Sequence, residues 1–475
     1  MGDINGLSTD ALPIVYRDAA DPDTFQEAAW GRVFNQRRDY SRRPRAVVRA
    51  SQPSHVKGAV DRAIEENARV SVRSGGHSWA GWSVRDEAIL IDFGNMRELD
   101  YNEETKIVSC SPSYTGRILN KFLNERGRMF AGGHCPDVGL GGFLLQGGMG
   151  WNCKNWGWAC EQIAGIDVVT ADGKQLHCSE QENSDLFWAA RGGGPGFPAV
   201  ITKFHLRTRA LLQMFDSTYV YPISQYKKIL QWVIDVCPTA DESLEIVCVG
   251  LHPPDSDEIH LVAGFTAFKK NQAEAEAALR PIHESRPSEF LLVDQFCEAT
   301  ALEDHYHRQA AANPEGHRYC SENAYIENDA DVPAVLESAF TTLPSRKSFA
   351  LYFAMNPTSR RPLPDMALSM HSDHYFALYT LWEDAKDDKR CTSWVHDNMR
   401  SIERFGVGSY LGDSDFQHRR TKFWSDENGK KLMDIRRKWD PLGRICGYLD
   451  VGDKSGIEGL KNVFEWKADA PPPYS

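Results

Sequence analysis

The sequence predicts a two-domain α+β protein. A chain of 475 residues is longer than one ordinary hydrophobic core accommodates, so two domains are expected. Between residue 44 and about residue 210, short β-type runs alternate with helical segments. Beyond about residue 212 the apolar alternation lengthens, which is typical of an antiparallel sheet with helices on one face; an example is the run Ile259, Leu261, Ala263 and Phe265.

The individual elements follow from apolar spacing and from turn residues. The first part contains four expected strands, at residues 45–50, 68–73, 88–93 and 106–112. A helix is expected to end at Gly127, and a hairpin is expected to close on residues 171–173. Three helices are expected in the second part, near residues 270–283, 332–342 and 386–404. A glycine-rich stretch near residue 406 marks another change of texture.

Composition excludes several classes of function. The formal net charge is −12 and the basic runs are short, so a nucleic-acid partner is not expected. No stretch approaches 18 consecutive apolar residues, so no membrane span is expected. Eleven cysteines without a C-x-x-C pair favour reduced thiols over a disulfide framework or a zinc site, and no metal site is expected. The acidic N-terminus lacks a secretory pattern, which favours a cytoplasmic location, although a trimmed secreted form would look the same.

Three glycine clusters, at residues 73–81, 132–150 and 191–197, indicate close approach of the backbone to another group. Interior glycines cost about 0.5–1 kcal/mol each relative to alanine, so a core element would not tolerate this density. No cluster matches the G-x-G-x-x-G or the G-x-x-x-x-G-K-[ST] pattern. Peptide N–H groups along such a groove would suit a long ligand with a diphosphate in its middle, such as a dinucleotide.

His77, in the stretch RSGGHSWAG, admits three interpretations. It is an ordinary loop residue, or it marks a cofactor site. In the third interpretation, the neighbouring Ser78 is a hydrolase nucleophile, because the sequence is one residue away from a G-x-S-x-G elbow. The polar residues that follow Gly81 disfavour the elbow, since an α/β-hydrolase needs a helix there.

An ordered set of motifs carries a specific resemblance. In chain order these are RSGGHS, CPDVGLGG, GGMGWNCKNWG, IDVVTADG, ENSDLFWAARGGGPG and RKWDPLGRI. The set resembles the FAD-binding half of the vanillyl-alcohol-oxidase superfamily, with a PCMH-type FAD-binding domain. The berberine-bridge-enzyme-like oxidases within it are the most similar group. The likeness is strong over residues 40–210 and looser over residues 405–450.

The resemblance implies an FAD-binding domain from residues 1–212 and 406–475, and a substrate-binding domain from residues 213–405. It implies that His77 is bonded to the flavin C8 methyl and Cys135 to C6. An imidazole nitrogen and a thiolate are both able to add to an electron-poor flavin. Further FAD contacts implied by the motifs are Arg73, Ser74, Gly75, Gly76, Ser78, Gly139, Gly141, Gly142, Gly148, Val168, Gly196, Ile201 and Tyr410.

The sequence departs from the family pattern in two places. In the third cluster, Pro195 and Pro198 remove N–H donors at the edge of the expected cofactor site. Near the C-terminus, the family's Y-x-N-Y-x-D becomes YLGDSD, so Tyr410 is kept and Asp413 replaces a second tyrosine that serves as or assists the base in several relatives. The remaining candidates for the base are Tyr114, His371, His374, Tyr375 and Tyr379.

The expected activity is that of a flavin-dependent oxidase. It would remove hydride from a C–H next to an alcohol or amine, with O₂ reduced to H₂O₂ and a general base taking the heteroatom proton. The expected substrate is a small molecule of secondary metabolism, with an oligosaccharide as the alternative, and the chain is expected to be a monomer. A different class, a flavin-bearing protein that has lost redox turnover, stays open because the second tyrosine is missing.

Overall fold

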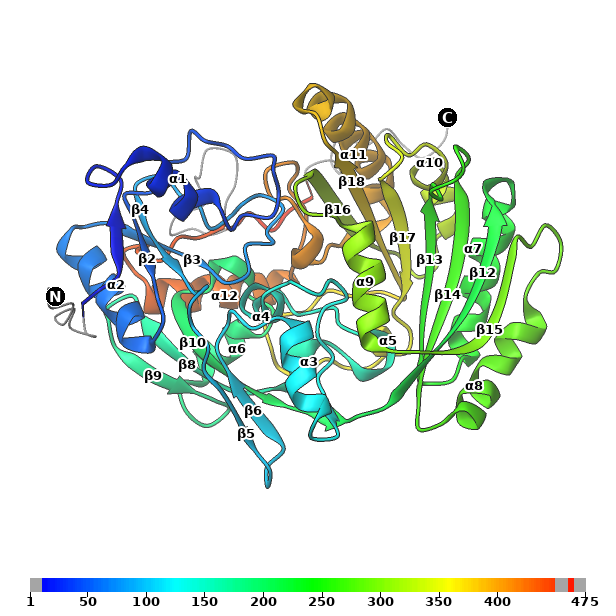
Figure 1. Cartoon of the computed structure of the whole chain (residues 1–475), viewed down its shortest axis with the longest axis horizontal. Coiled ribbons are helices and arrows are strands. Elements are labelled where there is room, and N and C mark those ends of the chain that lie inside the picture. Colours follow the sequence, from blue (N-terminus) through cyan, green and yellow to red (C-terminus); the bar gives the residue numbers. More distant parts are fainter. Residues whose placement is uncertain (1–10, 449–459, 465–475) are drawn as a thin grey trace, which may run out of the picture.

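The computed structural model describes residues 11–448 and 460–464. Within these residues, the strands form sheets of four, five and eight strands and one two-stranded pair. The four-stranded and five-stranded sheets and their helices lie on one side of the molecule, and the eight-stranded sheet lies on the other (Figure 1). The two-part α+β organisation that the sequence predicts is confirmed.

The four-stranded sheet contains the first residues of the described chain. Its order is β1 (Ile14–Tyr16), β2 (Ala46–Arg49), β4 (Ala88–Asp92) and β3 (Arg69–Arg73), with β2, β4 and β3 parallel. Helices α1 (Pro22–Trp30) and α2 (Pro53–Glu65) pack beside it. The α2 face that carries Val56, Ala59 and Val60 is fully buried, as its helical spacing predicts.

The five-stranded sheet follows the four-stranded sheet along the chain. Its order is β5 (Leu99–Asn102), β6 (Ile107–Cys110), β10 (Ala199–Arg207), β8 (Ile163–Thr170) and β9 (Gln175–Cys178), all antiparallel. The helices of this part are α3 (Gly116–Asn124), α4 (Leu140–Leu145), α5 (Cys153–Trp156), α6 (Ser184–Ala190) and the late α12 (Asp426–Trp439), which contacts α6. The short strands β7 (Arg128–Met129) and β11 (Arg209–Ala210) form the two-stranded pair.

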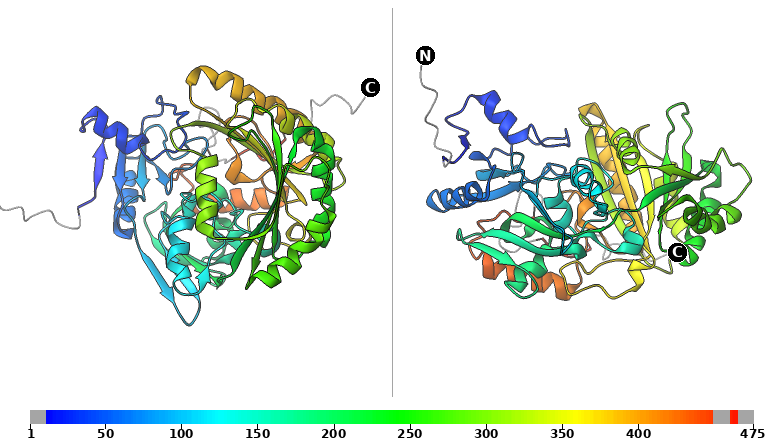
Figure 2. Two further views of the ribbon diagram at one scale, coloured as in Figure 1. Left: turned by 45° about the vertical axis from the view of Figure 1, so that its right-hand side comes forward. Right: turned by 60° about the horizontal axis from the view of Figure 1, so that its bottom comes forward.

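The eight-stranded antiparallel sheet is built from residues 213–408. Its order is β15 (Val293–Thr300), β12 (Gln213–Pro222), β14 (His260–Lys269), β13 (Leu244–Leu251), β17 (Phe349–Ala354), β18 (His374–Trp382), β16 (Arg318–Ile326) and β19 (Gly406–Gly408). Helices α7 (Tyr226–Val236), α8 (Gln272–Ser285), α10 (Val332–Thr341) and α11 (Asp388–Ile402) cover its outer face, and α9 (Leu302–Ala312) lies at the opposite face (Figures 1 and 2).

Alternation along β14 separates the two faces of this sheet. Leu261, Ala263 and Phe265 are buried in the core beneath the covering helices. Val262 and Gly264 point the other way and line a cavity. The alternating run in the sequence therefore marks the helix-covered face, because successive side chains of a strand point to opposite sides.

Candidate active site

A large cavity of about 1040 Å³ lies between the three glycine-rich loops and the face of the eight-stranded sheet opposite helices α7, α8, α10 and α11. The first wall comes from the loop after β3, the loop before α4, the start of β10, and the segment after β19. Strands β13, β14, β17 and β18 supply the opposite wall. Segments that are distant in sequence therefore meet around one enclosed volume, as a binding site requires.

Two glycine clusters meet backbone to backbone at this cavity. A Cβ atom on Gly75 would lie 2.5 Å from the Gly139 backbone nitrogen. Gly76 has φ of +82°, and a Cβ there would lie 1.8 Å from the Arg32 carbonyl oxygen. These contacts explain why the sequence requires glycine at both places, and they bring His77 and Cys135 to the same cavity.

His77 lies on the cavity wall with its ring stacked on Phe34, at a centroid distance of 4.4 Å and an interplanar angle of 18°. Burial and the nearby Arg32 lower the pKa of His77 to about 4. The imidazole is therefore neutral at neutral pH, with a nitrogen lone pair available as a nucleophile.

Cys135 lies on the same wall and is partly accessible. Burial, together with the charges of Asp413 and Asp137, raises the pKa of the Cys135 thiol to about 12. The thiol is therefore protonated at neutral pH when the cavity contains no flavin, and it must lose a proton to act as a nucleophile. In this respect it differs from His77, which is already in its nucleophilic form.

Asp413 is the most strongly hydrogen-bonded of the expected catalytic groups. The Tyr375 hydroxyl donates to Asp413 Oδ2 at 2.5 Å, and Tyr379 and Trp79 also favour the charged form of this carboxylate. Burial raises the pKa of Asp413, and the tyrosine bonds oppose that rise only in part. A carboxylate whose pKa is raised is a stronger proton acceptor than an ordinary aspartate.

Tyr410 is anchored rather than free. Its hydroxyl accepts hydrogen bonds from the backbone N–H groups of Gly148 at 3.2 Å and Met149 at 3.1 Å. A Cβ at position 412 would lie 2.4 Å from the Tyr410 ring, so Gly412 permits this packing. Tyr410 lines the cavity, but its oxygen is directed to the backbone of the second glycine cluster.

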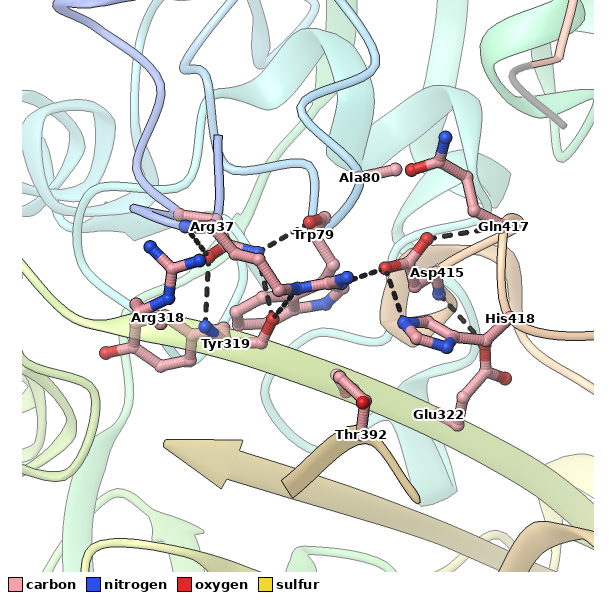
Figure 3. A network of polar contacts seen from close by, with 12 residues as sticks. Arg37, Trp79, Ala80, Arg318, Tyr319, Glu322, Thr392, Asp415, Gln417 and His418 are labelled. Atoms are coloured by element: carbon pink, nitrogen blue, oxygen red, sulfur yellow. Dashed lines mark hydrogen bonds and ion pairs between the residues drawn. The ribbon is translucent and has the colours of Figure 1, made fainter. Parts of the chain in front are cut away.

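A network of polar contacts around Asp415 fixes the loop that also carries Asp413; Figure 3 shows Asp415 between Arg37 and His418. Asp415 forms ion pairs with Arg37 and with His418, whose Nε2 lies 3.2 Å from Asp415 Oδ2. The Asp415 backbone N–H donates to Glu322 of β16 at 3.1 Å. Although burial opposes the charge, contacts with Cys320 and Asp415 raise the pKa of His418 to about 11. The network therefore links the N-terminal loop, the large sheet and the Asp413 loop.

Several expected site residues lie away from the cavity wall. The Tyr114 hydroxyl donates to the Arg97 carbonyl at 3.2 Å, in the core beside α3. His374 Nδ1 lies 2.8 Å from the Tyr352 hydroxyl on the helix-covered face, because strand alternation directs Tyr375 and Tyr379 to the cavity and His374 away from it. His371 lines a separate shallow surface pocket.

Some of the expected flavin contacts also lie away from the cavity wall. Val168 is in the core of the five-stranded sheet, and the Gly148 Cα faces Ala159 and Phe143. Gly196 packs against Tyr448, while the adjacent Pro195 and Phe197 reach the cavity. The remaining expected contacts line it: Arg73, Ser74, Gly75, Gly76, Ser78, Gly139, Gly141, Gly142 and Ile201.

Ser78 does not have the setting of a hydrolase nucleophile. Its hydroxyl accepts a hydrogen bond from the Trp82 backbone N–H at 3.3 Å. Residues 74–87 contain no helix, whereas a nucleophile elbow leads directly into one. The hydrolase alternative therefore has no structural support.

The sequence analysis did not identify a histidine–glutamate pair at the cavity. His134 Nε2 lies 3.0 Å from Glu245 Oε1, and the Asn152 backbone N–H donates to the other carboxylate oxygen at 2.6 Å. The His134 ring packs against Trp151 at a centroid distance of 4.3 Å. The position of His134 next to Cys135 was the signal that the sequence offered for this histidine. Its partner Glu245 lies 111 residues later, on β13.

The matched family model is an FAD binding domain over residues 44–179. The FAD-linked oxidoreductase nodO of Hypoxylon pulicicidum is 39% identical over 443 residues, which cover 93% of this chain and 98% of that protein. The chain belongs to the FAD-linked oxidoreductases. It is an enzyme of this family, and its cofactor is FAD.

The fold agrees with that assignment. BBE-like 1 of Physcomitrella patens superposes with a TM-score of 0.78 at 16% identity, and the match covers 98% of each chain. This FAD-linked oxidoreductase therefore has the fold of the berberine-bridge-enzyme-like flavoproteins. A xylooligosaccharide oxidase of Thermothelomyces thermophilus is 35% identical over only 180 residues, 37% of this chain and 36% of that protein.

No helix of the described residues is a candidate for a membrane span. In residues 11–448 and 460–464, none is both long and apolar enough to cross a bilayer.

Proposed function

We propose that this oxidoreductase is an oxidase with doubly tethered FAD, acting on a C–H bond next to an alcohol or amine. The observation that carries the proposal is the placement of His77, Cys135 and Asp413 on the wall of one cavity. In this proposal the flavin lies between the part formed by residues 1–212 and 406–475 and the part formed by residues 213–405. All the named groups come from one chain, which is consistent with a monomer.

The residues at the cavity fit FAD. Gly142 lines the cavity, and a Cβ at this position would have no neighbour within 4 Å, so the wall is open there. The contact of Gly75 with Gly139 leaves no room for side chains between the two loops that would hold the cofactor. His77 would bond to the flavin C8 methyl as a neutral imidazole, and Cys135 would bond to C6 after losing its thiol proton. Each bond would replace a C–H bond of the flavin, whose proton leaves, and the two electrons left on the flavin would pass to O₂ to give H₂O₂.

When bound, FAD would supply a hydride acceptor for the substrate, and O₂ would take the electrons from it to give H₂O₂. The protein's part is to take the proton from the substrate heteroatom while the C–H bond breaks. Asp413 is the group placed for this, with Tyr375 and Tyr379 orienting its carboxylate. Tyr410 stays bonded to Gly148 and Met149, which suits a positioning role.

The wall opposite the flavin loops favours an apolar substrate over an oligosaccharide. Its strands present Val247 and Val249 of β13, Val262 of β14, and Leu351 and Phe353 of β17 to the cavity. A carbohydrate site needs many hydrogen-bonding groups, because unpaired sugar hydroxyls are costly to desolvate. The xylooligosaccharide oxidase match covers only 37% of this chain, which also favours a substrate other than an oligosaccharide. We therefore infer a small molecule of secondary metabolism.

The decisive experiment is anaerobic mixing of the purified flavoprotein with a substrate panel. Apolar alcohols and amines should bleach the visible flavin absorbance, whereas oligosaccharides of matched concentration should not. Readmission of air should restore the colour with one H₂O₂ formed per product. Bleaching by oligosaccharides alone would reverse the assignment of substrate, and bleaching by no compound would favour a flavin-bearing protein without redox turnover.

A further inference from the structure

The outer face of the five-stranded sheet carries two histidines and an aspartate on three neighbouring strands. Asp167 is on β8, His177 is on β9 and His205 is on β10. Their sequence neighbours Ile166 and Phe204 are buried in the core, so the three side chains alternate to the opposite face. This cluster is separate from the flavin cavity, whose lining does not include it.

The ligand atoms of the three side chains converge. His177 Nδ1 lies 2.8 Å from one Asp167 oxygen, and His205 Nε2 lies 3.3 Å from the other. One ligand atom from each residue falls within 4.8 Å of both others. Zinc bonds to nitrogen and oxygen at about 2.0–2.2 Å, so ligand atoms of a tetrahedral site lie about 3.4 Å apart. Only small side-chain movements would bring the three groups around one ion.

The surroundings support metal binding by these groups. The Ser109 hydroxyl lies 2.7 Å from His205 Nδ1, which fixes the ring and leaves Nε2 as the ligand atom. A register irregularity between His205 and Leu206 is of the kind that re-aims a side chain at the edge of a ladder.

Neighbouring charges do not block an ion. Lys203 interacts with Asp167, but its ammonium group is paired with Glu98 at 2.8 Å. The side chains of His177, Asp167 and His205 are 45%, 36% and 23% exposed, so an ion could enter from solvent and keep water ligands. The same three groups would also form a hydrogen-bonded cluster without a metal ion. A measurement of metal binding distinguishes the two arrangements.

We propose that Asp167, His177 and His205 bind a divalent transition-metal ion of the zinc class, with water completing its shell. Two imidazoles and one carboxylate are ligands that zinc accepts. The ion would join β8, β9 and β10. Because the start of β10 contributes Val200 and Ile201 to the cavity, such a site would stiffen a strand that reaches the cofactor.

The test is calorimetric titration of zinc into chelator-treated, flavin-loaded protein that carries no histidine tag. We expect one zinc ion per chain. His177→Gln and His205→Gln should each weaken binding at least tenfold, and Ser109→Ala should weaken it by roughly tenfold as a loss of ring orientation. Zinc should raise the Tm of the wild type and not that of the His177→Gln variant.

His307→Gln is the matched control. His307 Nε2 lies 3.3 Å from Glu303 on the surface of α9, so it forms the same kind of histidine–carboxylate pair without a second histidine. Zinc affinity should be unchanged in this variant. The proposal is wrong if 100-fold excess zinc does not bind, if binding survives both cluster substitutions, or if His307→Gln weakens it equally.

Discussion

Replacing Asp413 with asparagine tests the assignment of the base. The substitution keeps the size of the side chain and an oxygen that can accept from Tyr375, which is 2.5 Å away in the wild type. It removes the ability to hold a proton. A positioned base contributes roughly 10²–10⁴ in rate, or about 3–5 kcal/mol of activation free energy. Anaerobic flavin reduction should therefore slow by roughly that factor.

Stopped-flow absorbance under anaerobic conditions measures this rate separately from reoxidation. Reoxidation by O₂ should be unchanged, because Asp413 acts on the substrate proton. In the wild type the reduction rate should rise with pH through the raised pKa of Asp413, since only the carboxylate accepts a proton. In Asp413→Asn this acidic limb should be lost. A reduction rate within about threefold of wild type would remove Asp413 from the role.

Stability gives an independent control for misfolding. The pKa of Asp413 is raised in the folded state, so the folded chain binds this proton more tightly than the unfolded chain does. The carboxyl group therefore favours folding at low pH and opposes it once the pH rises through its folded pKa. At pH 8, Asp413→Asn should keep or raise the Tm. Asp137→Asn, which neutralises an exposed carboxylate at the same cavity, is the matched control for rate.

Three further predictions concern the cofactor, the tyrosine and the supporting network. His77→Ala and Cys135→Ala should each leave FAD attached to the denatured chain through the other residue, and the double variant should release it, as measured by flavin fluorescence on a denaturing gel. Tyr375→Phe should shift the acidic limb of flavin reduction to higher pH, because the lost bond lowers the pKa of Asp413 in the wild type. Asp415→Asn breaks a buried ion pair and should destabilise the chain by about 3 kcal/mol, seen as a lower Tm with the flavin spectrum otherwise retained.

The sequence predicts the position of the cofactor-facing loops well, because the requirement for glycine there is local. Gly76 adopts a left-handed conformation against the Arg32 carbonyl, which another residue would not tolerate. The motifs around His77 and Cys135 therefore carry the geometry with them, and both side chains reach the cavity. The long alternating runs are informative for the same reason, since burial on one face of a strand imposes period two.

Catalytic groups that depend on long-range register are less predictable. Tyr375, Tyr379 and His374 lie on one strand, and the sequence does not show which alternate set faces the cavity. That choice depends on pairing with β17 and β16 and on the helices behind them. The His134–Glu245 pair is hidden for a similar reason, because it joins a glycine-rich loop to a strand of the other sheet.

The change from tyrosine to Asp413 has a chemical consequence that the structure makes explicit. The resemblance places a phenol at this position, whereas here a carboxylate accepts from the phenol of Tyr375 and is favoured in its charged form by Tyr379. An ordinary carboxyl group has a pKa about six units below that of a phenol. Burial raises the pKa of Asp413, which narrows this gap. Unlike a phenol, the carboxyl group needs no strong neighbouring cation to ionise it before it accepts a proton. In the proposed mechanism the tyrosines therefore tune and orient the base, and the aspartate accepts the proton.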